Sequence, residues 1–214
     1  MLSVIQAVIF DMDDVLVDTE NIDHQIALAV CKSLGIDLTP EEEESRLGRK
    51  TIEFYEKLFR EKNISLDITD TVVKHFALYE QKLSTELKIL PGAASLPRLL
   101  KSQGYLLGLV SGSTKRQVQI VLSQLGISEL FTAIISAEDV LLGKPDPEGY
   151  LLAAARLGVA PEVCVVIEDA PPGIASAKNA GMRVVGVTNH RTRDVSLADV
   201  RIDDLTQFDI KTLE

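Results

Sequence analysis

Five short apolar runs, rich in β-branched residues, constrain the fold of this chain more than any other feature of its sequence. They lie at residues 4–10, 106–110, 133–135, 163–167 and 183–187. Runs of this length and composition form strands that are buried on both faces of a parallel sheet. Helical patterns separate the later runs, at residues 115–125, 147–157 and 172–180. This alternation predicts an α/β fold with a doubly wound, Rossmann-like parallel sheet.

Glycines mark the ends of the predicted helices. Gly104, Gly126, Gly158 and Gly181 each follow a helical stretch and precede the next strand. A left-handed C-cap is needed at such positions, and glycine adopts it at low cost. Near the C-terminus, residues 200–202 are expected to add an edge strand.

The segment at residues 18–87 differs in character from the rest of the chain. Apolar residues such as Ile22 and Ile26 recur there at helical spacing among many charged residues. The sequence therefore predicts an all-helical cap domain at 18–87, inserted into a Rossmann-like core that consists of residues 1–17 and 88–214.

Charge and cysteine content narrow the possible partners and location. The formal net charge of the 214 residues is -10, which opposes binding to nucleic acid and to anionic membranes. Cys31 and Cys164 provide neither a disulfide framework nor metal-ligand spacing, which favours a reducing compartment. The chain has no basic, apolar leader and no long apolar span. We expect a cytoplasmic monomer with a small molecule as its partner.

Polar residues follow the predicted strands where a ligand would bind. In an open parallel sheet, ligands lie beyond the carboxyl ends of the strands. The residues at these ends are Asp11, Asp13, Asp14, Ser111, Gly112, Glu168 and Asp169. Lys144 lies in a further loop between Gly143 and Pro145. The sequence therefore predicts one site with several carboxylates, a hydroxyl and an ammonium group.

Such a set of side chains limits the chemistry. Carboxylates that lie close together raise one another's pKa unless a cation intervenes, so a divalent metal ion is implied. The candidate ligands are hard oxygens without histidine or cysteine, which favours Mg²⁺ over zinc. Mg²⁺ in turn indicates a phosphate-bearing substrate, whose charge the metal and Lys144 would neutralise together. One carboxylate would attack phosphorus and a second would transfer a proton.

Four segments resemble the motifs of the haloacid dehalogenase superfamily, in that family's order and over almost the whole chain. They are residues 10–16 (FDMDDVL), 110–113 (VSGS), 143–147 (GKPDP) and 167–173 (IEDAPPG). A single Asp-x-Asp pair would be weak support, whereas four motifs in this order are specific. The helical insertion after the first motif is similar to that of the β-phosphoglucomutase-like phosphatases, so the resemblance implies a phosphatase with a helical cap.

The resemblance also implies a role for each catalytic residue. Asp11 would be the nucleophile that forms an aspartyl-phosphate. Asp13 would be the general acid and base that protonates the leaving alcohol and then activates water. Ser111 and Lys144 would hold the transferring phosphoryl group, and the backbone around Gly112 would donate further hydrogen bonds to it.

A metal site is implied by the same resemblance. Asp11, the backbone carbonyl of Asp13 and Asp169 would bind Mg²⁺, with Glu168 nearby either directly or through water. The expected reaction is Mg²⁺-dependent hydrolysis of a small phosphate monoester, with a sugar phosphate as the favoured substrate class.

Two departures from the family pattern affect the assignment within the family. Asp14 stands where this branch usually has glycine, although other phosphatase branches have aspartate there. Mutases of this branch carry a cap-side histidine at a position that holds Asp23 here, with His24 one residue later. One helical step is about 100°, so His24 does not replace that histidine without a shift of register. This favours a phosphatase over a mutase.

Substrate choice would depend on the cap. Arg49, Lys50 and Lys82 resemble the cap loop and cap lysine that face the active site in related enzymes. Without the resemblance, these residues are more simply surface charges that pair with the surplus acids. Specificity is therefore not transferred from relatives.

Two alternative functions stay open. A β-phosphoglucomutase-type isomerase would use the same core chemistry and return the phosphate to its product. A phospho-accepting regulatory module would also combine an acidic cluster, a hydroxyl and a lysine on a doubly wound sheet. Such modules are shorter, at about 120 residues, and have no inserted helical cap.

Overall fold

The computed structural model of the chain describes residues 4–45, 51–191 and 193–213. The chain divides into two compact units. The core unit consists of Met1–Asp18 and Lys88–Glu214, and the helical unit consists of Thr19–Leu87.

The core unit includes Asp18, one residue beyond the expected boundary, because Asp18 forms a backbone hydrogen bond and an ion pair with Lys88. The N–H of Asp18 donates to the carbonyl of Lys88 (2.9 Å), and the ammonium of Lys88 lies 3.1 Å from the carboxylate of Asp18. Next to them, Val17 and Ile89 form an antiparallel bridge. The two segments that leave and re-enter the core unit are therefore paired along their backbones.

A six-stranded parallel sheet forms the centre of the core unit, in the order β3-β2-β1-β4-β5-β6. The strands are β1 (Ala7–Phe10), β2 (Leu106–Val110), β3 (Ala133–Ile135), β4 (Cys164–Glu168), β5 (Arg183–Val187) and β6 (Val200–Ile202). The central strands β1 and β4 are buried along their whole length, as their unbroken apolar sequences predict. The predicted doubly wound sheet and its edge strand β6 are confirmed.

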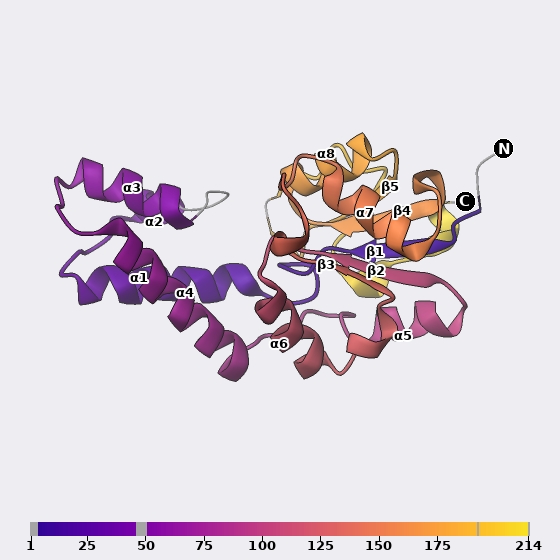
Figure 1. Ribbon diagram of the computed structural model, residues 1–214, viewed down its shortest axis with the longest axis horizontal. Coiled ribbons are helices and arrows are strands. Elements are labelled where there is room, and N and C mark those ends of the chain that lie inside the picture. The colour runs from indigo at the N-terminus through magenta and orange to yellow at the C-terminus, as the bar shows by residue number, and fades with distance from the viewer. Residues whose placement is uncertain (1–3, 46–50, 192, 214) are drawn as a thin grey trace. The chain divides into compact units, whose positions relative to one another are not determined.

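Helices cover both faces of this sheet, with α7 and α8 on one face and α5 and α6 on the other (Figure 1). Their bounds are α5 (Ser95–Ser102), α6 (Lys115–Leu125), α7 (Glu148–Leu157) and α8 (Pro171–Asn179). Five short 3-10 helices lie at η1 (Ser128–Leu130), η2 (Ala137–Asp139), η3 (Pro161–Val163), η4 (Leu205–Gln207) and η5 (Ile210–Leu213). Gly126 and Gly158 end α6 and α7 with φ of 62° and 72°, so the predicted left-handed caps are confirmed there.

The helical unit contains α1 (Thr19–Ser33), α2 (Pro40–Glu44), α3 (Thr51–Glu61) and α4 (Ile68–Thr85). Helix α4 packs against both α1 and α3. Its His75, 1% exposed, lies between two polar side chains, with Nδ1 3.0 Å from the hydroxyl of Tyr55 and Nε2 2.8 Å from Oδ1 of Asp23. This chain of hydrogen bonds links α1, α3 and α4.

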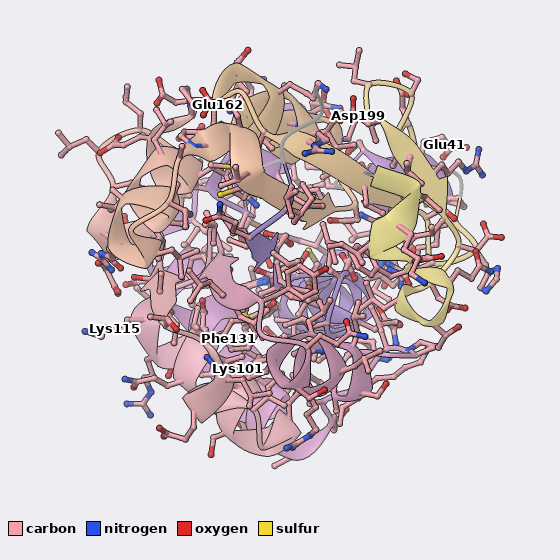
Figure 2. The ribbon with its side chains drawn as sticks, turned by 90° about the vertical axis from the view of Figure 1, so that its right-hand side faces the viewer. Glu41, Lys101, Lys115, Phe131, Glu162 and Asp199 are labelled. Carbon is pink, nitrogen blue, oxygen red and sulfur yellow. The ribbon has the colours of Figure 1, made fainter. Side chains whose placement is uncertain are left out.

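Both acidic and basic side chains lie on the exterior of the chain. Figure 2 shows the exposed side chains of Lys115 and Glu162 at the periphery of the view. In the part of the chain that the structure describes, no helix is both long and apolar enough to span a membrane. The monomeric state and the cytoplasmic location stay predictions.

Gly92 and Gly104 have similar positive φ angles but different surroundings, so replacing each of them with alanine tests how tightly Leu205 packs against Gly92. Gly92 has φ of 84°, and a Cβ there would lie 2.7 Å from Cβ of Leu205 and 2.9 Å from its carbonyl carbon. Gly104 has φ of 92°, but a Cβ there would meet no atom within 4 Å. We expect Gly104→Ala to lower the free energy of unfolding by about 1 kcal/mol through backbone strain. Gly92→Ala should cost about 1–3 kcal/mol more, because it adds a steric clash.

Urea denaturation of the two variants and the parent chain measures both costs. If both variants lose the same free energy of unfolding, Leu205 moves aside without cost and the predicted clash is wrong.

Candidate active site

The register of the sheet brings the first acidic motif beside the last. Phe10 at the end of β1 pairs with Leu109 of β2 and with Ile167 of β4. The next residue, Asp11, therefore lies level with Glu168, and its N–H donates to the carbonyl of Ile167 (2.9 Å). The carboxyl ends of three neighbouring strands thus supply the site, as the sequence predicts.

Lys144 bridges two buried carboxylates. Its Nζ lies 2.5 Å from Oδ1 of Asp11 and 2.6 Å from Oε1 of Glu168. The hydroxyl of Tyr150 donates to the same oxygen of Glu168 (3.1 Å), and Nζ lies 5.4 Å from the centre of the Tyr150 ring. The side chain of Glu168 is 1% exposed and that of Asp11 is 7% exposed. One ammonium group is therefore in direct contact with two carboxylates that are largely shielded from water.

The loop that carries Lys144 is held in place by its own neighbours. The hydroxyl of Ser176 in α8 donates to the carbonyl of Asp146 (2.6 Å). The carboxylate of Glu148 accepts from the N–H of Leu142 (2.8 Å). These bonds anchor the loop on both sides of Lys144, so the ammonium is directed into the site.

Glu168 is fixed by the start of α8. Its Oε2 accepts from the N–H groups of Asp169 (2.8 Å) and Ala170 (3.0 Å). A Cβ on Gly173 would lie 1.6 Å from Oε1 and 2.0 Å from the carboxyl carbon of Glu168. Gly173 therefore provides the space that this carboxylate fills.

Burial and neighbouring charges shift the pKa values of this group. Burial raises the pKa of Asp11 well above its usual value; Lys144 opposes this, and the charges of Glu168 and Asp13 add to it. Burial by itself lowers the pKa of Lys144, but Asp11 and Glu168 outweigh it and raise that pKa. Burial, followed by the charge of Glu168, raises the pKa of Tyr150. Lys144 thus stays a cation, and additional positive charge would favour the ionised form of Asp11.

Asp13 is oriented by two hydroxyl groups. Its Oδ2 accepts from Oγ of Ser111 and from Oγ of Ser113, both at 2.9 Å. The N–H of Ser113 donates to the hydroxyl of Ser111 (3.0 Å). Gly112 between them is exposed, and a Cβ there would meet no atom within 4 Å. Packing therefore does not require a glycine at this position.

Three buried acids fit the requirements of a divalent metal ion. Asp11, Glu168 and Asp169 each offer a carboxylate oxygen, and these atoms lie within 4.8 Å of one another. Their donors are hard oxygens, which suit Mg²⁺. Both oxygens of Glu168 already accept hydrogen bonds. The donor set therefore fits a metal held mainly by Asp11 and Asp169.

The loop after β5 adds two arginines that the sequence analysis missed. Arg193 pairs with Asp169, and its Nη2 lies 3.2 Å from Oδ2 of Asp14. Arg191 lies 3.1 Å from Oδ1 of Asp14 and 2.6 Å from Oδ1 of Asp18. The rule applied to the other strands, that polar residues after an apolar run line the site, would have found this loop as well.

These contacts explain the aspartate at position 14. Asp14 has φ of 55°, in the left-handed region where glycine is favoured and aspartate is tolerated. Its carbonyl accepts from the side-chain amide of Asn189. The carboxylate, which glycine lacks, is bound by the two arginines, so the backbone turn of the motif is kept while an anchor for the β5 loop is added.

The sequence analysis also predicted three cap residues that would face the substrate. Arg49 and Lys50 lie outside the described residues. Lys82 lies in α4, where its Nζ donates to Glu86 (2.6 Å) and Gln25 (3.2 Å) of the helical unit. Their role in substrate choice stays a prediction.

Replacing Gly173 tests how tightly the buried carboxylate is held. We expect Gly173→Ala to lower the free energy of unfolding by about 1–3 kcal/mol, because the new methyl group displaces Glu168 from its hydrogen bonds. Gly143→Ala is the matched control, since a Cβ there would meet no atom within 4 Å. The control should stay within about 0.5 kcal/mol of the parent chain in urea denaturation. Equal stability of the two variants would contradict the assignment of Gly173.

Comparisons with known proteins identify the family of this chain. Residues 8–187 match the family model described as haloacid dehalogenase-like hydrolase. Hexitol phosphatase B of Escherichia coli (strain K12) is 33% identical over 98% of this chain and 96% of that protein. A phosphorylated carbohydrates phosphatase of Thermotoga maritima is 34% identical over 86% of each chain.

A solved structure gives the same result for the fold. The crystal structure of β-phosphoglucomutase from Clostridium difficile superposes with a TM-score of 0.79, at 30% identity, over 98% of this chain and 95% of that one. The family resemblance of the four motifs is thereby confirmed. The chain belongs to the haloacid dehalogenase-like hydrolases.

Proposed function

We propose that the chain is a Mg²⁺-dependent phosphatase that hydrolyses sugar or polyol phosphate monoesters through an aspartyl-phosphate. The observation that carries the proposal is the ammonium of Lys144, which contacts Asp11 and Glu168 beside an Asp13 held by two serines. These side chains would supply a nucleophile, a cation for the phosphoryl group and a proton-transfer group.

In the first step, an oxygen of Asp11 attacks phosphorus as the bond to the ester oxygen breaks. Lys144, already in contact with Asp11, would hold a non-bridging phosphoryl oxygen and offset the charge that builds up there. Ser111 and the backbone of the Ser111–Ser113 turn would hold another of these oxygens. When the substrate leaves bulk water and enters the site, less solvent would screen these electrostatic contacts, so they would be stronger.

Asp13 would transfer the proton in both half-reactions. Its Oδ2 already accepts two hydroxyl donors, so the proton would be carried on Oδ1. Asp13 first donates this proton to the leaving alcohol, and its carboxylate then takes a proton from the water that attacks the aspartyl-phosphate. The ester is thereby converted into alcohol and inorganic phosphate, and both carboxyl groups return to their starting state.

Mg²⁺ would be held by Asp11, the backbone carbonyl of Asp13 and Asp169, with Glu168 as the counter-ion of Lys144. When bound, the ion supplies positive charge to the phosphoryl oxygens and to the carboxylates around it. Burial is the main cause of the raised pKa of Asp11, and the charges of Glu168 and Asp13 add to it, so a nearby cation would favour the ionised nucleophile.

The substrate class is supported by the names of two relatives. Both the hexitol phosphatase of Escherichia coli and the Thermotoga maritima enzyme carry carbohydrate or polyol phosphates in their names. Both align with most of this chain, and neither name refers to a nucleotide. We therefore infer a neutral, hydroxyl-rich leaving group.

The geometry of the helical unit favours hydrolysis over the mutase alternative. Asp23, where the mutases carry a histidine, is bound through Oδ1 to the buried His75 (2.8 Å). His24 lies 3.5 Å from the carboxylate of Glu43. This chain therefore carries a carboxylate where the mutases carry an imidazole, and the imidazole of His24 pairs with Glu43 within the helical unit. The regulatory-module alternative is disfavoured by membership of a hydrolase family and by the inserted helical unit.

Release of inorganic phosphate tests the proposal directly. The panel contains hexitol phosphates, hexose phosphates, nucleoside monophosphates and an aryl phosphate, each with Mg²⁺ and with EDTA. We expect release that depends on Mg²⁺, with kcat/KM at least about tenfold higher for a sugar or polyol phosphate than for the nucleotides. Conversion of a hexose 1-phosphate into its 6-phosphate without release would establish the mutase instead.

Asp11→Asn tests the nucleophile and the electrostatics of the site together. Phosphate release should fall at least about a thousandfold, because an amide does not replace the attacking carboxylate. In EDTA, the variant should have a higher Tm than the parent chain, and more so at pH 8 than at pH 5. The folded-state pKa of Asp11 is raised, so the parent loses stability as pH rises through that pKa, and the amide removes this loss.

Thermal denaturation at the two pH values measures the difference. A larger gain at pH 5 than at pH 8 would contradict the raised pKa of Asp11.

A further inference from the structure

The loop after β5 places a positive charge at the candidate metal site. Nη1 of Arg193 pairs with Oδ2 of Asp169, whose side chain is 5% exposed. Asp169 is one of the three buried acids with ligand atoms within 4.8 Å of one another. The guanidinium of Arg193 therefore occupies a carboxylate that the metal ion would also use.

This contact is supported by a second anchor. Nη2 of Arg193 lies 3.2 Å from Oδ2 of Asp14, so one guanidinium bridges two carboxylates from different loops. Asp14 is itself held by Arg191 (3.1 Å) and by the side chain of Asn189. An arginine does not lose its proton at any ordinary pH. The positive charge is thus a permanent part of the site.

A guanidinium and a divalent cation repel each other when both contact one carboxylate. We propose that Arg193 competes with the metal ion for Asp169. The arginine pairs with this acid in the metal-free protein, and the pair between Arg193 and Asp169 breaks when the ion binds. Asp14 retains the arginine nearby in both states. The proposal rests on the proposed function, because it concerns the same metal site.

Two consequences follow from this competition. Metal binding includes the cost of breaking the contact between Arg193 and Asp169, so this chain binds its metal more weakly than the acidic cluster alone would. In the absence of metal, the same contact stabilises the fold, because it offsets repulsion among the buried acids. Removing the arginine should therefore strengthen metal binding and weaken the metal-free protein.

The test uses Mn²⁺, which prefers the same oxygen ligands as Mg²⁺ and is detected in solution by electron paramagnetic resonance. We expect Arg193→Gln to bind Mn²⁺ at least about tenfold more tightly than the parent chain. Arg191→Gln is the matched control: it removes the same charge from the same loop, but Arg191 contacts Asp14 and Asp18 instead of Asp169. Its Mn²⁺ affinity should stay within about threefold of the parent chain.

Thermal denaturation supplies a second readout. In EDTA, the Tm of Arg193→Gln should be lower than that of the parent chain, and the increase in Tm on adding Mn²⁺ should be larger. Arg193→Lys keeps the charge and should return the Mn²⁺ affinity to within about threefold of the parent value.

The outcomes separate this proposal from the proposed function. Weaker Mn²⁺ binding by Arg193→Gln would mean that the arginine orients Asp169 for the metal, which would overturn the competition. Equal strengthening in Arg193→Gln and Arg191→Gln would overturn it too, as a general effect of net charge. Absence of Mn²⁺ binding to the parent chain and to every variant would overturn the metal site of the proposed function itself.

Discussion

The site depends on the balance between one ammonium group and the buried carboxylates that it contacts. Nζ of Lys144 lies within 2.6 Å of oxygens of both Asp11 and Glu168, whose side chains are 7% and 1% exposed. An unpaired charge in this environment would cost several kcal/mol of folding free energy. The positions of the acids and of the lysine are therefore determined together.

This balance is achieved by loops that are far apart in the sequence. Each follows a parallel strand or precedes the start of a helix, and their polar side chains meet at one edge of the sheet. The backbone N–H groups at the start of α8 hold Glu168, and Gly173 leaves room for it. The sheet thus aligns the loops, and the start of α8 together with Gly173 positions the carboxylate of Glu168.

The helical unit contains a polar network of its own. His75 is buried between Tyr55 and Asp23, which ties three helices together through side-chain hydrogen bonds. A carboxylate only accepts, so Nε2 donates to Asp23; in the neutral imidazole, Nδ1 then accepts from the hydroxyl of Tyr55. The aspartate that distinguishes this chain from the mutases is therefore also part of the packing of the helical unit.

The sequence by itself determined the fold class, the helical insertion and the acidic and hydroxyl residues of the four motifs. Those features are local: apolar runs, helix periodicity and the polar residues that follow each strand are visible within about ten residues of one another. A helix before Gly104 was expected without bounds, and the structure places it at α5 (Ser95–Ser102). The conclusion that Asp14 departs from the family pattern also came from the sequence.

Only the tertiary structure decided what that departure does. Asp14 and Arg193 are far apart in the sequence, and no local pattern relates an acidic turn after β1 to a basic loop after β5. Likewise, no motif relates Tyr150 to Glu168 or Asp23 to His75. Charge pairing depends on distances of a few ångströms between side chains. Those distances are set by the order of the strands and the packing of the helices, which come into being only when the whole chain folds.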